Sequence, residues 1–172
     1  MKYKKQKGFS LIELLVVMAI ITILLSIVIP GFVKMGPGRR LKSAARDVVS
    51  DIQLAKTQAL RDRRTYSILF DSAGYTVMKD GNVKKTVRIS DYPGVQFGSG
   101  YGKVTGIDFG AEDTIDGVTF NGNIITFNAN STIDAVGGIY LKNEDKTTYA
   151  VLCLSTAGGV KTYKNLDGSG WK

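Results

Sequence analysis

The side chains that could do chemistry are few in this chain, because its 172 residues include no histidine and a single cysteine. Histidine is the commonest general base and the commonest transition-metal ligand near neutral pH. A catalytic thiol needs a neighbouring base or cation, whereas Cys153 alternates with Tyr149 and Val151 in an apolar segment that indicates a buried strand. We therefore expect no catalytic residue, no cofactor and no disulfide within the chain, and we expect that the protein is not an enzyme.

Oxygen ligands are grouped once, in a glycine-containing segment with four carboxylates: Asp108, Glu112, Asp113 and Asp116. Calcium binds oxygen-rich loops of this kind, but the spacing differs from that of an EF-hand loop. A solvated loop is the main interpretation, and a weak calcium site is the alternative. The stretch 98–103 resembles a phosphate-binding loop in its glycines and final lysine, yet Val104 stands where serine or threonine is required.

Net charge is unevenly distributed along the chain. The formal net charge is +8, and four of the positive charges belong to lysines near the amino terminus: Lys2, Lys4, Lys5 and Lys7. Residues 39–64 carry 8 basic and 3 acidic side chains, whereas residues 65–172 carry 10 and 11. The basic excess therefore belongs to one predicted helix, which has no interleaved aromatic residues for stacking on bases and contains three aspartates.

The amino-terminal element that follows these lysines is an apolar run of 21 residues, Phe9 to Ile29, with one charge at Glu13. As a helix this run is about 31 Å long, which is enough to cross a bilayer core. The lysines lie on one side only, so the positive-inside rule predicts a cytoplasmic amino terminus and an exported domain. A carboxylate costs about 3 kcal/mol at the bilayer centre and less near its edge. Glu13 is thus either a group that reaches the headgroups of a plain anchor or a group that awaits a cation.

The segment Gly8-Phe9-Ser10-Leu11-Ile12-Glu13-Leu14 resembles the class III signal of type IV pilins and type II secretion pseudopilins. In that family a membrane peptidase cuts after the glycine, here Gly8, and methylates the new amino-terminal phenylalanine, here Phe9. The resemblance implies that Glu13 pairs with the terminal amine of a neighbouring subunit during assembly. Pro30 matches a proline that commonly kinks the pilin helix. A buried charge is tolerable when it is paired, so the physical interpretation agrees.

Downstream of this run the sequence predicts a helix packed on antiparallel β-sheet, an α+β domain. Residues 39–63 place apolar side chains at intervals of three and four, while charged side chains, Asp51 among them, fall largely on other faces. Gly36-Pro37-Gly38 predicts a flexible joint over 32–38. From residue 65 the period changes to two, which predicts strands over 65–70, 74–78, 83–89, 95–97, 104–109, 118–120, 123–127, 139–142, 147–154 and 159–164. Residues 165–172 are predicted to be a mobile polar tail.

The last third of the domain resembles the GspH/FimT branch of the minor pilins in four segments: 125–128, 138–141, 151–155 and 158–161. Two departures stand out, because Asn130-Ser131 replaces a usual glycine and basic residue, and Gly159 stands where the branch often has arginine. Some FimT-like minor pilins bind DNA through a basic terminal segment. The resemblance therefore makes Lys161 and Lys164 the candidates for a DNA contact.

The sequence thus predicts a leader over 1–8, a transmembrane and assembly helix over 9–31, a joint over 32–38, and a GspH/FimT-like domain over 39–172. The implied function is that of a minor pilin or pseudopilin in a type II secretion pseudopilus or a type IV pilus. Its implied partners are other pilin subunits, the prepilin peptidase and methyltransferase, and the cytoplasmic membrane. The alternative is a DNA-binding minor pilin that acts as a receptor in DNA uptake.

Overall fold

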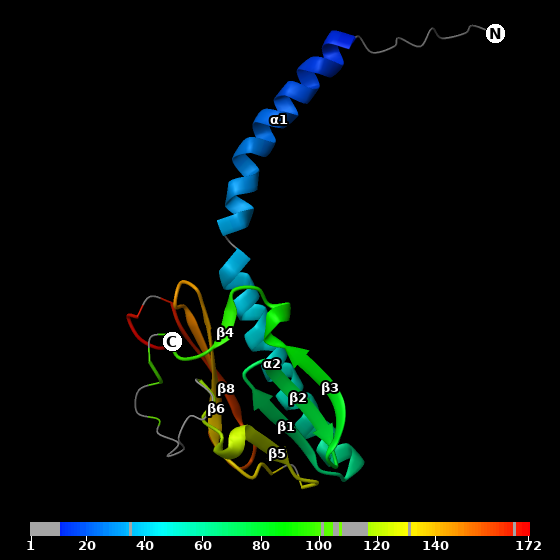
Figure 1. The fold of residues 1–172 in the computed structure, drawn as a ribbon, viewed down its shortest axis with the longest axis vertical. Helices are drawn as coiled ribbons and strands as arrows, with labels where there is room; N and C mark the ends of the chain where they lie inside the picture. The colour runs from blue at the N-terminus through cyan, green and yellow to red at the C-terminus, as the bar shows by residue number, and fades with distance from the viewer. Residues whose placement is uncertain are drawn as a thin grey trace, which may run out of the picture. The chain divides into compact units, whose positions relative to one another are not determined.

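The computed structural model describes residues 11–34, 36–100, 102–104, 107, 117–130, 132–166 and 168–172 (Figure 1). The chain divides into two compact units, Met1–Gly36 and Pro37–Lys172. The first contains the helix α1, Leu11–Lys34, and the second begins within the helix α2, Gly36–Asp62. The eight strands of the chain's described part all follow α2.

Both helices extend beyond the bounds that the sequence predicts. Pro30 lies inside α1 and does not end it, and the kink predicted at this residue stays a prediction. Pro37 lies in the first turn of α2, where a missing N–H costs little, so the helix begins at Gly36 and not at residue 39. The predicted interruption over 32–38 is therefore corrected to helix at 32–34 and 36–38, and the flexibility assigned to it stays a prediction.

The predicted apolar stripe of α2 is confirmed. Its buried residues are Leu41, Ala44, Ala45, Val48, Asp51, Ile52, Ala55 and Ala59. They follow one another at intervals of three and four, so they form one face of the helix. Asp51 is the charged residue on this otherwise apolar face. The expectation that its carboxylate lies on the solvated face is therefore wrong.

Four strands form the first antiparallel sheet, in the order β3-β2-β1-β5. Their bounds are Tyr66–Asp71 (β1), Gly74–Lys79 (β2), Asn82–Arg88 (β3) and Ile124–Phe127 (β5). Two tight turns set the register of the first three strands. The Asp71 carboxylate accepts hydrogen bonds from the N–H groups of Ala73 and Gly74 at 2.7 and 2.8 Å. At the next turn, Asp80 and Gly81 both adopt positive φ, as a two-residue hairpin requires.

The second antiparallel sheet has the order β4-β6-β7-β8. Its strands are Val95–Phe97 (β4), Gly137–Asn143 (β6), Thr148–Cys153 (β7) and Val160–Asn165 (β8). β6 and β7 form a hairpin over the predicted polar turn at 143–146, where Lys146 adopts positive φ. β8 is an edge strand of this sheet, a position that matters below.

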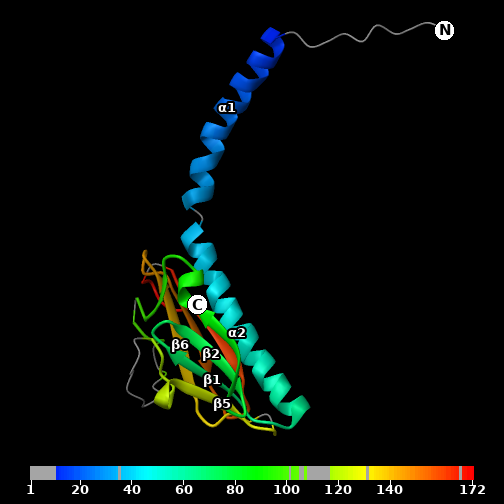
Figure 2. The same cartoon turned by 45° about the vertical axis from the view of Figure 1, so that its right-hand side comes forward.

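The main core lies between α2 and the inward faces of both sheets (Figures 1 and 2). Phe70 of β1 is at its centre and contacts the rings of Tyr75, Phe97 and Phe120 at centroid distances of 5.7–6.3 Å. A second cluster lies on the opposite face of the β4-β6-β7-β8 sheet and is built on Tyr140, Ala150 and Leu152. Each face of this sheet is therefore apolar, which explains the nearly continuous burial of β6 and β7.

Three sequence predictions for this unit are corrected. Residues 118–120 do not form a hairpin with 123–127, because Asn121–Asn123 is a 3₁₀ turn and β5 pairs with β1 instead. Val118 forms an isolated bridge with Ile139, which belongs to the other sheet. Of the predicted strand 104–109, the described residues Val104 and Ile107 lie outside any strand and pack in the second cluster.

The tail is the third correction, since its last residues are held in place. Lys172 exchanges two backbone hydrogen bonds with Lys164, both at 2.9 Å. The indole of Trp171 donates to the Lys103 carbonyl at 3.1 Å, and its ring meets Tyr140 edge-on at 5.9 Å. One aromatic anchor thus fixes a segment whose polar composition predicts mobility.

Candidate functional site

The surface of α1 is apolar on all sides over 11–23, the part whose side chains the structure describes. Ten large hydrophobic residues between Leu11 and Ile23 are exposed by 45–80% of their surface: Leu11, Ile12, Leu14, Leu15, Val16, Val17, Met18, Ile20, Ile21 and Ile23. Because these positions are nearly consecutive, they cover the whole circumference of the helix and not one stripe. A helix of this kind needs an apolar environment outside its own chain.

Glu13 lies in the first turn of α1 and is exposed. The amino terminus of a helix favours a negative charge, so the position suits a carboxylate. Gly8 and Phe9, the predicted cleavage and methylation residues, lie outside the described residues. Within the described part of the chain, no helix has both the length and the apolar character required to cross a membrane.

The two lysines predicted to contact DNA do not form one site. In β8, Lys161 is opposite Leu152 of the second cluster, whereas Lys164 is opposite Tyr149, which packs against the main core. Residues directly opposite each other in a ladder share a face, so the two lysines point to opposite faces of the sheet. The sequence already indicates this difference, because side chains three residues apart in a strand point to opposite faces.

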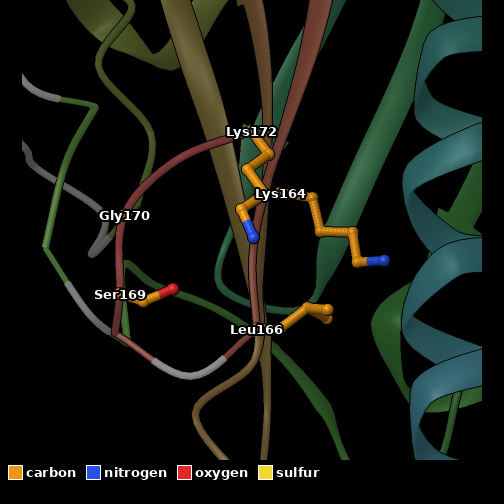
Figure 3. Close-up of a pocket in the computed structure, with 5 residues that line it drawn as sticks. All are labelled: Lys164, Leu166, Ser169, Gly170 and Lys172. Atoms are coloured by element: carbon orange, nitrogen blue, oxygen red, sulfur yellow. The ribbon is translucent and has the colours of Figure 1, made fainter.

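Lys164 lines a shallow pocket together with Leu166, Ser169, Gly170 and Lys172 (Figure 3). The pocket forms where the chain turns back after β8 and Lys172 pairs with Lys164. The side chain of Lys164 extends toward the side on which α2 lies (Figure 3). Lys164 therefore belongs with the surface between α2 and β8, and Lys161 does not.

That surface is a groove, which we call the α2–β8 groove, and sequence reasoning missed it. One part is lined by Lys42, Ala45, Arg46 and Val49 of α2 with Tyr149 and Thr162, and the next by Gln53, Lys56, Thr57 and Leu60 of α2 with Gly158 and Val160. The helix residues recur at intervals of three and four, so both parts follow one flank of α2. The only available sequence signal was the i, i+4 pair of cations at 42 and 46.

The opposite flank of α2 carries its three acidic residues, and each is bonded to the protein. Asp47 accepts a hydrogen bond from the Tyr92 hydroxyl at 2.6 Å, and Asp51 accepts one from Tyr75 at 2.7 Å. Asp51 also receives Lys85 at 2.7 Å on both oxygens. Burial, with Asp51 adjacent, raises the pKa of the Tyr75 hydroxyl well above its usual value.

Asp62, at the end of α2, is bonded in the same way. Its carboxylate accepts hydrogen bonds from Lys79 at 2.6 Å, Tyr66 at 2.8 Å and Arg61 at 3.0 Å. These donors hold the pKa of Asp62 far below its usual range, Lys79 being the largest cause. Asp51 and Asp62 therefore attach the helix to the β3-β2-β1-β5 sheet, and Asp47 attaches it to Tyr92, which lies outside that sheet. Each of the three carboxylates has a hydrogen-bond donor within the fold.

The remaining predicted sites can be placed briefly. The four acidic residues of the calcium alternative lie outside the described residues, and the described part of the chain contains no metal-ligating cluster. In the segment 98–103, which resembles a phosphate-binding loop, the N–H groups of Gly98 and Gly102 donate to the carbonyl oxygens of Tyr140 and Ser99. Cys153 is fully buried, and burial raises the pKa of its thiol to about 12, so it is an apolar core residue.

Comparisons with known proteins find matches for both the amino-terminal segment and the domain that follows it. Residues 3–29 match the family model described as the prokaryotic N-terminal methylation motif, and residues 44–158 match that of the type II transport protein GspH. No curated protein sequence shows significant similarity. Among solved structures, the type IV minor pilin FimU of Pseudomonas aeruginosa is similar with a TM-score of 0.50 and 16% identity, over 80% of this chain and 96% of that one.

At this identity the likeness to FimU shows a shared fold, α+β with a long helix packed on antiparallel sheets. The GspH model covers about two thirds of the chain, and the methylation motif covers the segment that precedes it. Motifs of this amino-terminal type are found in membrane-anchored subunits of pilus and pseudopilus systems. The chain belongs to the GspH family of type IV pilin-like minor pilins and pseudopilins.

Proposed function

We propose that this protein is a non-enzymatic structural subunit, cleaved after Gly8, methylated on Phe9 and assembled through α1 into a type II secretion pseudopilus or a type IV pilus. The observation that carries the proposal is the exposed apolar surface around α1 with a single carboxylate, Glu13, in its first turn. Before assembly the bilayer would cover this surface, and afterwards the helices of neighbouring subunits would cover it. Either environment removes the exposed side chains from water.

Glu13 would give the assembled state its register. In an apolar surrounding an unpaired carboxylate is costly, whereas a carboxylate paired with an amine is tolerated. Cleavage after Gly8 creates such an amine at Phe9, four residues before Glu13 in the mature chain. Every subunit carries Glu13 and its terminal amine on one short segment. A neighbouring subunit displaced along the fibre axis can therefore place its amine beside Glu13 and pair with it.

The membrane orientation follows from the lysines that precede Gly8. Four positive charges would keep the leader in the cytoplasm, where the prepilin peptidase acts, and the unit Pro37–Lys172 would lie outside the cytoplasm. The subunit would thus remain a single-pass membrane protein until it is extracted into a filament.

The test compares Glu13→Ala with the isosteric Glu13→Gln, beside Gly8→Ala as a processing control. We expect both Glu13 variants to be cleaved and methylated, as shown by mass spectrometry, but to be largely absent from sheared filament fractions. Gly8→Ala should keep its leader and stay in the membrane. Incorporation of Glu13→Ala at the level of the unmodified protein would refute the assembly role of Glu13.

The choice of machine needs a separate experiment. The matched family is described as a type II transport protein, whereas the similar solved structure is described as a type IV minor pilin. Deletion of the subunit should abolish export of secreted enzymes if it serves a pseudopilus. It should instead abolish surface pili if it serves a type IV pilus.

The alternative of a DNA receptor has weaker support. Lys161 and Lys164 lie on opposite faces, so the predicted basic segment does not present them together. The observation in its favour is the basic flank of α2, Lys42 and Arg46, on the same side of the sheet as Lys164. Duplex binding that falls steeply with salt and is lost in Lys42→Glu/Arg46→Glu would favour uptake.

A further inference from the structure

β8 has an open edge, and the chain itself shows how that edge can be used. β8 is the terminal strand of its sheet, paired on one side with β7. On its other side Lys164 exchanges two backbone hydrogen bonds with Lys172, the pattern of an antiparallel bridge. The N–H and C=O groups of Lys164 therefore point outward, away from β7.

The outward direction recurs at every second residue of a strand. Thr162 and Val160 must therefore present their N–H and C=O groups on the same edge as Lys164. No further strand of the described chain pairs with them. Backbone groups of this kind are a template for a polypeptide in extended conformation.

The side chains beside this edge line the α2–β8 groove. Thr162 lies in the part of the groove that holds Lys42 and Arg46, and Val160 lies in the next part, which Leu60 also lines. Leu60 is 55% exposed and adds an apolar side chain to this part of the groove. The groove thus combines an open strand edge with apolar patches and a cationic rim.

The charge of the groove indicates what it takes. Among the residues that the structure describes, its lining includes Lys42, Arg46 and Lys56 and no acidic side chain, and Lys164 lies on the same face of β8. Lys56 donates to the carbonyls of Ala157 and Gly158, which fixes the cation beside β8 without neutralising it. The acidic residues of α2 lie on the other flank and are bonded there. An anionic ligand therefore meets no repulsion from the lining.

We propose that the α2–β8 groove binds an extended acidic segment of a partner polypeptide by strand addition to the outward edge of β8 at Val160 and Thr162. Backbone hydrogen bonds supply the affinity common to any extended segment. Every second side chain of the added strand faces the groove, and acidic side chains at these positions meet Lys42 and Arg46. The intervening side chains point to the opposite face of the sheet. The site is independent of α1, so it does not depend on whether the subunit assembles through that helix.

The geometry provides a variant that removes the edge without breaking the sheet. In Thr162→Pro the missing N–H is the outward one, so the ladder with β7 is preserved, and proline is tolerated on edge strands in this orientation. The matched control Thr162→Val keeps the N–H and changes only the hydroxyl. A second pair is Lys42→Glu/Arg46→Glu against Lys161→Glu, because Lys161 carries the same charge on the opposite face of the sheet.

The experiment measures fluorescence anisotropy of a labelled heptapeptide of alternating glutamate and valine, titrated with the full chain in detergent micelles. Controls are the same peptide with lysine for glutamate and a short labelled DNA duplex. We expect binding of the acidic peptide to weaken by about tenfold or more in Thr162→Pro and in the double charge reversal, the effect of losing about 1.4 kcal/mol. Thr162→Val and Lys161→Glu should stay within about twofold of the unmodified protein.

Three results would overturn the proposal. The first is absence of acidic-peptide binding by the folded protein, and the second is binding that Thr162→Pro leaves intact. The third is tight duplex binding that the acidic peptide cannot displace, which would assign the cationic rim to nucleic acid. Circular dichroism of each variant confirms that a loss of binding is not a loss of fold.

Discussion

Substitution of Asp51 is the sharpest test of how α2 is held to the β3-β2-β1-β5 sheet. Its carboxylate is 5% exposed and accepts hydrogen bonds from Tyr75 and Lys85, all at 2.7 Å. Asp51→Ala would leave the Tyr75 hydroxyl, on a residue 4% exposed, buried without a partner, which costs about 1–3 kcal/mol. The lost bonds to a charged group add to this, but Lys85 is half-exposed, so its share is small. We expect a total loss of about 3 kcal/mol in the free energy of unfolding.

The assay is urea unfolding of the compact unit Pro37–Lys172, which has its own core. Asp51→Asn keeps an acceptor for Tyr75 and should cost only about 1–2 kcal/mol. Tyr75→Phe removes the orphaned hydroxyl, so the double variant with Asp51→Ala should be less unstable than the sum of the two by about 1–2 kcal/mol. Ser50→Ala, at an exposed neighbouring position, should change stability by less than about 0.5 kcal/mol.

A loss below about 1 kcal/mol for Asp51→Ala would refute this reasoning. So would strict additivity with Tyr75→Phe, because it would mean that the two side chains do not share an interaction. An unchanged m-value is required for either conclusion, since a change in m would indicate an altered unfolded or native state.

Three further predictions concern the same unit. Burial raises the pKa of Cys153 to about 12 and also raises that of Tyr75, so above about pH 9 the folded state keeps protons that the unfolded chain releases. The free energy of unfolding should therefore be full below about pH 9 and fall as the pH rises above it. Cys153→Val should remove the part of the fall that begins near pH 9, as measured by urea unfolding at stepped pH. Gly137→Ala would place a Cβ against the ring of Phe120 and should lower stability by about 2–3 kcal/mol. In α2, the Cβ of Gly38→Ala meets no atom within 4 Å, so this variant should raise stability by about 0.5–1 kcal/mol. Equal effects of the two variants in thermal unfolding would contradict the packing at Gly137. Trp171→Ala removes the edge contact with Tyr140 and the bond to Lys103, so it should lower stability by about 2–3 kcal/mol and speed amide exchange at Lys172; a neutral result would restore the mobile tail.

Local signals predicted the elements that local signals control. The hairpins β1-β2 and β2-β3 depend on turns whose residues bond within the turn or adopt positive φ, and both are visible as Asp71 to Gly74 and Asp80-Gly81. The stripe of α2 depends on a helical period that the sequence displays over six apolar positions. The amino-terminal motif depends on neighbouring residues, so it too could be recognised without a structure.

Pairings between distant segments could not be predicted. β5 joins β1 across more than fifty residues, so Asn121-Gly122, which looks like a hairpin turn, serves to redirect the chain between the two sheets. The burial of Asp51 likewise depends on Tyr75, which lies 24 positions further along the chain. The order of the tail depends on one contact, Trp171 with Tyr140, that no local pattern announces. The opposite facing of Lys161 and Lys164 was available from strand alternation alone.

The distribution of charge explains why composition misleads about this domain. Residues 39–64 contain 8 basic and 3 acidic side chains, so by composition alone the aspartates dilute the positive charge of the helix. In the structure Asp51 and Asp62 accept hydrogen bonds from side chains of the β3-β2-β1-β5 sheet, and Asp47 accepts one from Tyr92, which lies outside that sheet. Their negative charge is therefore paired inside the fold, and the flank with Lys42 and Arg46 keeps its positive potential. A ligand beside β8 meets the local field of that flank, because at physiological ionic strength charges beyond about 8 Å are largely screened. The net charge of the domain consequently says little about what the α2–β8 groove attracts.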